Sequence, residues 1–181
     1  MKKEIYLVLH NIRSAHNVGS IFRTADAAGV SKIYLCGYTP TPARFARFDP
    51  GSSKRSNLDL ESKDKISKVA LGAEKTVPWE QHKQTWRLLK KLSTYKVRPC
   101  IIRPCIIVAL EQSPKAIDYR KFKPKFPLVL ILGNEVGGLS KEILKYADEI
   151  IAIPMYGRKE SLNVSVAAGV ALYQLANYLE F

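Results

Sequence analysis

Three segments of the sequence contain residue types that could bind a ligand or take part in a reaction. The first is NIRSAHNVGSIFRTADAAGV, at residues 11–30. In this segment we expect Asn17 to cap a helix, Gly19 to allow close approach, and Arg23 to present a planar guanidinium suited to phosphate. Taken alone, the segment fits equally a capped helix with an arginine on its surface.

The second segment is LVLILGNEVGGLS, at residues 128–140, where a strand-like run leads into Gly133, Asn134 and Glu135. Glycines let the backbone approach a ligand, whose polar edges main-chain N–H and C=O groups can then bind. The spacing matches neither the GxGxxG fingerprint of dinucleotide-binding proteins nor the phosphate-binding P-loop. Dinucleotides and nucleoside triphosphates are therefore disfavoured as ligands.

The third segment is IPMYGRKESLNVSVAAGVALY, at residues 153–173. Ser161, Asn163 and Ser165 gather at the start of its predicted helix. Such side chains cap helices, and they can also bind a ligand. Each segment alone could be structural, but the three together in this order indicate a functional site.

The elements around these segments are expected to alternate as strands and helices. Apolar runs of strand length occupy residues 4–9, 32–38, 106–110, 128–132 and 149–154. This alternation predicts an α/β fold with a mainly parallel sheet. Because the carboxyl ends of parallel strands lie at one edge of the sheet, we expect the three segments to converge there.

Two helices are predicted from apolar residues at spacings of three and four. One follows Asn17 and ends at Gly29, and the other runs from Val164 to Leu179. The alanines of the second helix suit close packing against the sheet or another subunit. A third, helix-like stretch covers residues 80–95.

The composition indicates one globular domain with a polyanionic partner. The chain has 181 residues, of which 46% are hydrophobic, and a net charge of +13. Nucleic acid is the best-fitting partner, because Lys and Arg release counterions from phosphates. An anionic membrane surface and plain solubility are the alternatives. We expect a cytoplasmic protein without a membrane span, and the three cysteines lack the spacing of a metal site.

Basic and aromatic residues are interleaved at residues 39–57, which read as a long loop. We expect this loop to contact RNA through Arg44, Arg47, Lys54 and Arg55, because basic groups grip phosphates and aromatic rings stack on bases. A solvated loop pinned by two phenylalanines is an equally good interpretation. A second basic cluster lies at residues 115–125.

A tandem pentapeptide, RPCII, occupies residues 98–102 and again 103–107. Five inserted residues would turn every following side chain of an unbroken strand to the opposite face, and Pro104 could not donate a hydrogen bond within a central strand. We therefore expect the second copy to enter the sheet at about Cys105, with the first copy outside it or at an edge.

The ordered set N-x-G-x-x-x-R-x-A, L-G-N-E-x-x-G-L and I-P-M-x-G-x-x-x-S-L-N-V-S-x-A closely resembles the three motifs of the SpoU family of RNA ribose 2′-O-methyltransferases, within the SPOUT class. The likeness is to minimal, TrmH-like members and covers nearly the whole chain. It implies a single domain over residues 1–181, with a six-stranded, mainly parallel sheet, helices on both faces and a trefoil knot. It further implies a homodimer that uses S-adenosylmethionine to methylate structured RNA.

The resemblance also implies roles for individual residues. Asn17 and Arg23 would be the catalytic pair, with Glu135 and Ser161 helping to arrange them. Arg23 would act as a cation, since a guanidinium rarely gives up a proton; the general base stays open, with His10 and His16 nearby. The cofactor would contact Leu110 and the loop that follows it, together with Gly133, Asn134, Glu135, Ile153, Met155, Ser161, Leu162 and Asn163.

Two alternatives to this function are a noncatalytic, knotted RNA-binding or assembly module and a transferase acting on a base. The intact Arg23, Asn134, Ser161 and Asn163 weigh against the first, and the motif-one arginine weighs against the second. With no appended RNA-binding domain, tRNA is slightly favoured over rRNA as the substrate. The sequence departs from its relatives upstream of Leu110, where the doubled RPCII lengthens a segment.

Overall fold

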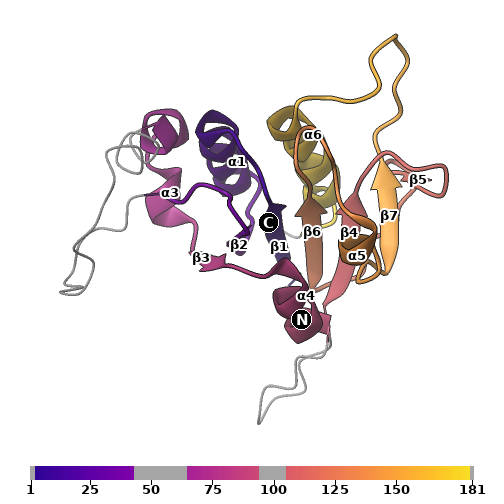
Figure 1. The fold of residues 1–181 in the computed structure, drawn as a ribbon, viewed down its shortest axis with the longest axis horizontal. Helices are drawn as coiled ribbons and strands as arrows, with labels where there is room; N and C mark the ends of the chain where they lie inside the picture. The colour runs from indigo at the N-terminus through magenta and orange to yellow at the C-terminus, as the bar shows by residue number, and fades with distance from the viewer. Residues whose placement is uncertain (1–2, 43–64, 94–104, 180–181) are drawn as a thin grey trace.

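The computed structural model of the chain describes residues 3–42, 65–93 and 105–179, and it contains a parallel sheet (Figure 1). Within these residues the sheet has seven strands in the order β3-β2-β1-β6-β4-β7-β5, and every pair is parallel. The strands are β1 Ile5–His10, β2 Lys32–Cys36, β3 Trp79–His82, β4 Ile106–Leu110, β5 Ile117–Asp118, β6 Leu128–Leu132 and β7 Glu149–Ala152. The predicted α/β class with a parallel sheet is confirmed.

The middle strands form the buried part of the sheet. β6 is buried over its whole length and lies between β1 and β4, with Leu128 in register with both Ile5 and Ile106. The expected strands 106–110 and 128–132 match β4 and β6 residue for residue. Both are apolar without interruption, as strands covered on both faces must be.

The two outer strands correct the sequence-based expectations. The resemblance implied six strands, whereas the described part of the chain contains seven. The edge strand β3 occupies part of residues 80–95, which were expected to be helical, and α4 Thr85–Ser93 takes the rest. β3 and the two-residue β5 escaped prediction because an edge strand needs no apolar run to pair with its single neighbour.

Helices cover both faces of the sheet, as expected (Figure 1). The alternating side chains of β1 show the division: Leu7 and Leu9 pack with one cluster of buried residues, and Val8 with the other. On the first face lie α1 Ala15–Ala27, α3 Ala73–Thr76 and α6 Val164–Ala176; on the second lie α4 and α5 Lys141–Leu144. Residues 65–70 are also helical.

α1 begins three residues earlier than predicted. Its N-cap is Ser14, whose hydroxyl accepts a hydrogen bond from the Asn17 backbone N–H, so the expectation that Asn17 is the cap is wrong. The predicted stop is correct, since Gly29 follows the C-cap with a φ of 70°. Gly19 does allow close approach, but to a neighbouring helix: a Cβ there would lie 2.7 Å from the Ile66 carbonyl oxygen.

The N-cap of α6 is Asn163, one of the three capping candidates that the sequence offers at this point. The Asn163 side chain accepts a hydrogen bond from the Ser165 backbone N–H at 2.9 Å. One face of the helix is buried through residues such as Ala168 and Leu172. Its opposite face is also apolar, with Val166 51% and Tyr173 55% exposed.

Several expectations fall on residues that the structure does not describe. Arg44, Arg47, Lys54 and Arg55, together with the first RPCII copy, lie outside the described residues. The second copy enters the sheet as expected, because β4 begins at Ile106, directly after Cys105. Among the described residues, no helix is both long enough and apolar enough to cross a membrane.

Candidate active site

A cavity of about 270 Å³ opens at the carboxyl ends of β4, β6 and β7. All three predicted segments were expected at this edge, and two of them line the cavity directly. The residues proposed for the cofactor that line it are Leu110, Gly133, Asn134, Glu135, Ile153, Ser161 and Leu162. Met155 and Asn163, which were also proposed, are not among the lining residues.

Two polar side chains line the cavity directly after β4, in the loop after Leu110 that the resemblance implies for the cofactor, although neither was named individually. The Glu111 carboxylate accepts hydrogen bonds from the backbone N–H groups of Leu139, at 2.7 Å, and Gln112, at 3.1 Å. The Gln112 side chain donates to the Ile153 carbonyl at 2.9 Å. Glu111 and Gln112 thereby connect the end of β4 to the loops after β6 and β7. Their position after a strand end was the signal that pointed to them.

The loop after β6 is closed upon itself, which explains its glycines. Asn134 and Gly138 exchange two backbone hydrogen bonds, of 3.2 and 2.9 Å. A Cβ on Gly133 would lie 2.5 Å from the Gly138 carbonyl carbon, and Gly138 has a φ of 60°. The close approach at Gly133 leaves no room for a Cβ, and the left-handed backbone at Gly138 favours glycine.

Asn134 also ties its loop to the ends of β1 and β2. Its side-chain amide donates to the Asn11 carbonyl at 2.8 Å and to the Tyr38 hydroxyl at 2.7 Å. Its Oδ1 accepts from the backbone N–H groups of Val136 and Gly137. Every polar atom of the Asn134 side chain is therefore engaged in holding the wall of the cavity.

The Glu135 carboxylate lies at the amino end of α1. It accepts hydrogen bonds from the Arg13 N–H at 3.1 Å, the Ser14 N–H at 3.4 Å and the Asn17 side-chain amide at 3.0 Å. Partial burial acts to raise the pKa of Glu135, but these donors outweigh it and hold the pKa below its usual value. A carboxylate at a helix amino end is also favoured by the helix dipole.

Asn17 joins the three sequence motifs through its side chain. Its Nδ2 donates to Glu135, while its Oδ1 accepts from the Asn163 side-chain amide at 3.2 Å. We call the chain Glu135, Asn17 and Asn163 the motif bridge. It connects the loop after β6, the first turn of α1 and the first turn of α6, so the expected convergence of the three segments is what the structure contains.

Arg23 lies away from the motif bridge. It is exposed, six residues after Asn17 on α1, which is about 9 Å along the helix axis. It is not among the residues that line the cavity, whereas Ser161 is. The described part of the chain therefore unites Asn17, Glu135 and Ser161 around one edge of the sheet and leaves Arg23 on the neighbouring helix surface.

The two histidines near the first motif differ in surroundings. The His10 ring nitrogens contact the Thr85 hydroxyl at 2.7 Å and the Asn11 amide at 3.2 Å, and burial lowers the pKa of His10. Asn11 donates through Nδ2, so His10 accepts at Nε2 and donates from Nδ1 to Thr85. His10 is thus a neutral, fully engaged side chain, whereas His16 is exposed on α1.

The cavity combines apolar walls with acidic side chains. Leu110, Leu132, Ile153, Leu162 and Val164 supply apolar surface, and the carboxylates belong to Glu111, Glu135 and Glu160. This lining suits a ligand that carries a flat apolar ring and positive charge. Among the described residues, no three His, Cys, Asp or Glu side chains are grouped so as to hold a metal ion.

Comparisons with known proteins agree with this geometry. The SpoU rRNA methylase family matches residues 4–61 and 53–173. The tRNA (guanosine(18)-2′-O)-methyltransferase of Aquifex aeolicus is 32% identical over 173 residues, which cover 96% of this chain and 69% of the relative. The 23S rRNA (guanosine-2′-O-)-methyltransferase RlmB of Neisseria meningitidis is 30% identical over 168 residues, which cover 93% of this chain and 56% of the relative.

Solved structures give the same result. The AdoMet-bound rRNA methyltransferase from Sinorhizobium meliloti superposes with a TM-score of 0.76 at 28% identity, covering 100% of this chain and 59% of that chain. This chain thus spans less than two thirds of that protein and of the Neisseria relative. Since the family match covers most of the sequence and its motifs surround one cavity, the chain belongs to the SpoU methylase family.

Proposed function

We propose that this chain transfers a methyl group from S-adenosylmethionine to a ribose 2′-oxygen in structured RNA, with tRNA slightly favoured over rRNA. The observation that carries the proposal is the motif bridge, because it holds the loop after β6 and the start of α6 at the rim of one cavity. The named relatives include tRNA and rRNA 2′-O-methyltransferases. With RNA as its substrate, the protein would act in the cytoplasm.

The lining of the cavity fits S-adenosylmethionine. Apolar side chains such as Leu110, Leu132 and Ile153 suit the adenine ring. Glu111 and Glu160 carry negative charge that suits the sulfonium and the ammonium group. When bound, the cofactor supplies an electrophilic methyl group. Of the residues proposed for its binding, Met155 and Asn163 would act from outside the described lining.

Transfer requires that the ribose hydroxyl be positioned and that negative charge developing on its oxygen be stabilised. We assign the second task to Arg23, whose positively charged guanidinium would also hold the adjacent phosphate. Because Arg23 does not line the cavity of its own chain, it would act at the subunit boundary of the homodimer that we propose below. A phosphate oxygen or a water molecule would then accept the proton, because both ring nitrogens of His10 are already engaged. Asn17 and Glu135 act by positioning, and Ser161 by arranging the ligand at the cavity wall.

We further propose a homodimer that covers α6. A helix that is apolar on all sides is usually buried, yet Val166 and Tyr173 are more than half exposed on one side of α6. α1 packs against α6. A second copy on the exposed face of α6 would therefore also place Arg23, which lies on α1, near the subunit boundary. We also propose that the chain forms the trefoil knot that the family resemblance implies.

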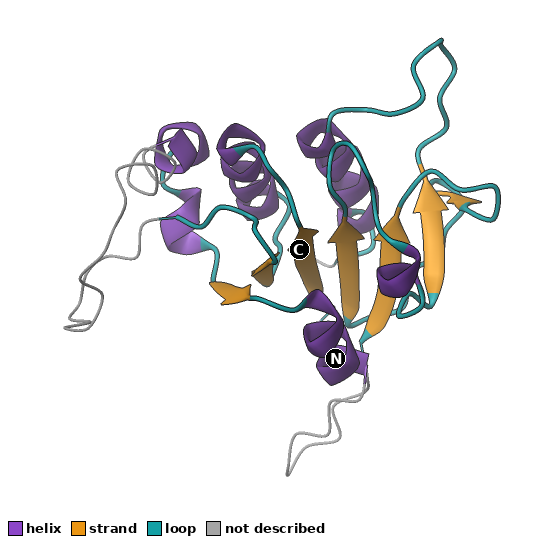
Figure 2. Cartoon of the chain, viewed as in Figure 1, coloured by secondary structure: helices purple, strands orange, loops and turns teal. Residues whose placement is uncertain are grey.

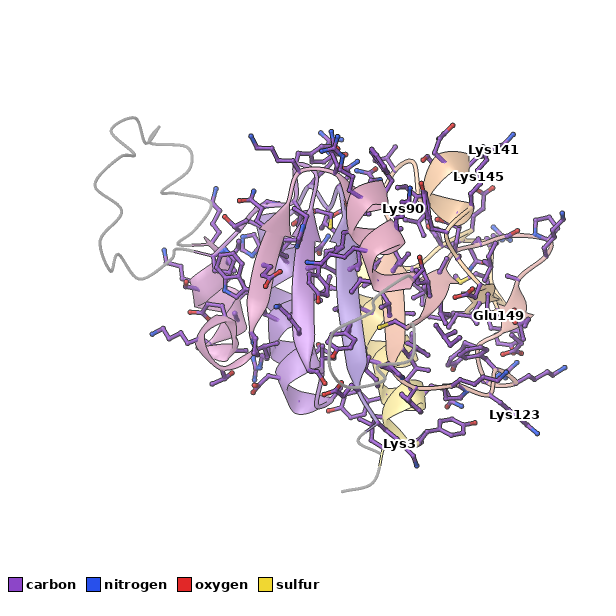
Figure 3. The ribbon with its side chains drawn as sticks, turned by 90° about the horizontal axis from the view of Figure 1, so that it is seen from below. Lys3, Lys90, Lys123, Lys141, Lys145 and Glu149 are labelled. Atoms are coloured by element: carbon purple, nitrogen blue, oxygen red, sulfur yellow. The ribbon has the colours of Figure 1, made fainter. Side chains whose placement is uncertain are left out.

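RNA would contact the chain through basic side chains near the cavity edge. Arg44, Arg47, Lys54 and Arg55 are proposed from the sequence. Figure 3 shows Lys90, Lys141 and Lys145 at one end of the face formed by α4 and α5, with Lys3 and Lys123 at the other end. Lys3 and Lys123 precede β1 and β6, so the first group lies toward the carboxyl ends of the strands.

Two measurements test the proposal. Calorimetry with S-adenosylmethionine, S-adenosylhomocysteine, NAD and ATP is expected to give binding with the first two alone. Mapping of ribose methylation in tRNA and rRNA from cells with and without the gene is expected to reveal one lost site. Absence of S-adenosyl binding, even with RNA present, contradicts the cofactor assignment. Binding of RNA without any lost methylation would support the noncatalytic module instead.

A further inference from the structure

Tyr156 is the most exposed aromatic side chain among the described residues. It is 82% exposed, whereas the next tyrosine, Tyr38, is 59% exposed. Figure 2 shows the long loop between β7 and α6, which contains Tyr156, projecting from the body of the molecule. A single exposed apolar side chain is common on protein surfaces, so a role for this ring depends on the groups around it.

The ring of Tyr156 is supported from one side by Arg120. The Arg120 guanidinium carbon lies 6.0 Å from the ring centroid, which is the outer range of a cation–π contact. Arg120 itself is fixed by Asp118, to which its Nε donates at 3.0 Å. Because Asp118 neutralises this arginine, Arg120 is suited to holding the ring in place rather than to binding phosphate.

The loop that carries Tyr156 begins and ends at the cavity. Ile153, three residues before Tyr156, lines the cavity, and the chain returns to line it again at Glu160, Ser161 and Leu162. Three residues span at most about 10 Å. Val136, which is also 82% exposed, lies on the opposite loop that lines the same cavity. Val136 thus lies at the cavity itself, and Tyr156 lies on the loop whose two ends line the cavity.

Charge on the same loop indicates the chemistry of the partner. Arg158 and Lys159 follow Tyr156 by two and three residues, and both are exposed. An exposed aromatic ring beside two cations is the combination that binds unpaired nucleotides, with the ring stacking on a base and the cations contacting phosphates. A double helix offers no free base face, so the ring selects for RNA whose bases are unpaired.

We propose that Tyr156, held by Arg120, is a stacking platform for an unpaired base next to the ribose that enters the cavity. The proposal rests on the proposed function and deepens it, because it restricts the substrate to nucleotides in loops or single strands. Tyr156 therefore acts on RNA affinity and choice of nucleotide, not on binding of S-adenosylmethionine.

The test compares the whole 181-residue chain with four variants of it, using unfractionated tRNA and rRNA from cells that lack the gene. Tyr156→Ala is expected to weaken RNA binding roughly 5- to 150-fold, the range measured for loss of one stacked base. Its affinity should keep the wild-type dependence on salt, because no phosphate contact is removed. Tyr156→Phe, which keeps the ring, should retain most of the affinity, and Arg120→Gln should lose part of it.

Tyr178→Ala provides the control, because Tyr178 is also an exposed tyrosine, with 37% of its surface accessible. It follows the end of α6, at the opposite end of that helix from Val164 and Ala167, which line the cavity, and its loss should leave RNA affinity unchanged. Equal losses in the Tyr156 and Tyr178 variants, or wild-type affinity of Tyr156→Ala, would overturn the proposal. A change of oligomeric state in Tyr156→Ala would do so too, since the ring would then be an interface residue. Failure of the wild-type protein itself to bind or methylate RNA refutes the proposed function instead.

Discussion

Replacing Glu135 by glutamine separates a positioning role from a catalytic one. The substitution keeps the size of the side chain but removes its charge. The carboxylate accepts from Arg13 through one oxygen and from Ser14 and Asn17 through the other. A glutamine has a single acceptor oxygen, so its amide group must face at least one of these donors and lose that hydrogen bond.

The cost can be estimated from these contacts. A hydrogen bond to a charged group contributes about 1.5–3 kcal/mol, and a charge at a helix amino end about 0.3–1 kcal/mol. Because Glu135 is only partly buried, solvent screening reduces both of these energies. We expect Glu135→Gln to lower the free energy of unfolding by about 1.5 kcal/mol at pH 7, which corresponds to a fall in Tm of roughly 3–6 °C.

The lowered pKa of Glu135 determines how the stability difference between the wild-type protein and the variant changes with pH. The folded pKa of Glu135 lies below its usual value of 4.5, so its stabilisation is present above that pH and is lost as the pH falls through the folded pKa. In urea unfolding, the difference between the wild-type protein and the variant should therefore be largest at pH 7 and shrink below about pH 4.5. Equal stability at pH 7 combined with lost methyl transfer would refute the positioning role, and so would a difference that does not change with pH.

Three further predictions follow from described features. Gly19→Ala should destabilise the protein by about 1–2 kcal/mol because its Cβ would lie 2.7 Å from the Ile66 carbonyl oxygen, whereas Gly169→Ala, whose nearest contact is 3.6 Å away, should be neutral or stabilising in the same unfolding assay. Arg23→Ala should abolish methyl transfer in a single-turnover assay while calorimetry shows nearly unchanged cofactor affinity; near-normal turnover would disprove its role. Deletion of residues 98–102 should preserve the circular dichroism spectrum, the dimer and cofactor binding, because the second RPCII copy restores the sequence before β4; collapse of that variant would disprove the assignment.

The predictability of the fold depends on burial. β4 and β6 were predicted with their correct ends because strands buried on both faces must be apolar throughout. β3 has the sequence WEQH, and its polar residues suit an edge strand with one neighbour and a solvated side. Local pattern does not distinguish this segment from a helix, so the prediction for residues 80–95 was wrong in its first part.

The sequence predicted most residues of the site, but it did not predict which of them contact one another. Ser14 and Asn17 are both good capping residues, and nothing local to them shows that Asn17 contacts Glu135, which lies 118 positions away. The motifs pointed to the residues, whereas the motif bridge depends on the tertiary fold. Glu111 and Gln112 were expected only as part of the loop after Leu110, and their individual contacts were not predictable, since their partners Leu139 and Ile153 lie on other loops.

The position of β6 between β1 and β4 determines when the protein can become functional during its synthesis. β1 leaves the ribosome long before β6, because the strand that pairs with its second side starts only at Leu128. Until then one edge of β1 has no strand to pair with, and such edges are prone to intermolecular pairing. The wall of the cavity is completed later still, when α6 up to Ala167 has been made. A chain interrupted anywhere before α6 would therefore have no cavity of this kind, and random truncation should yield aggregated fragments rather than partly active ones.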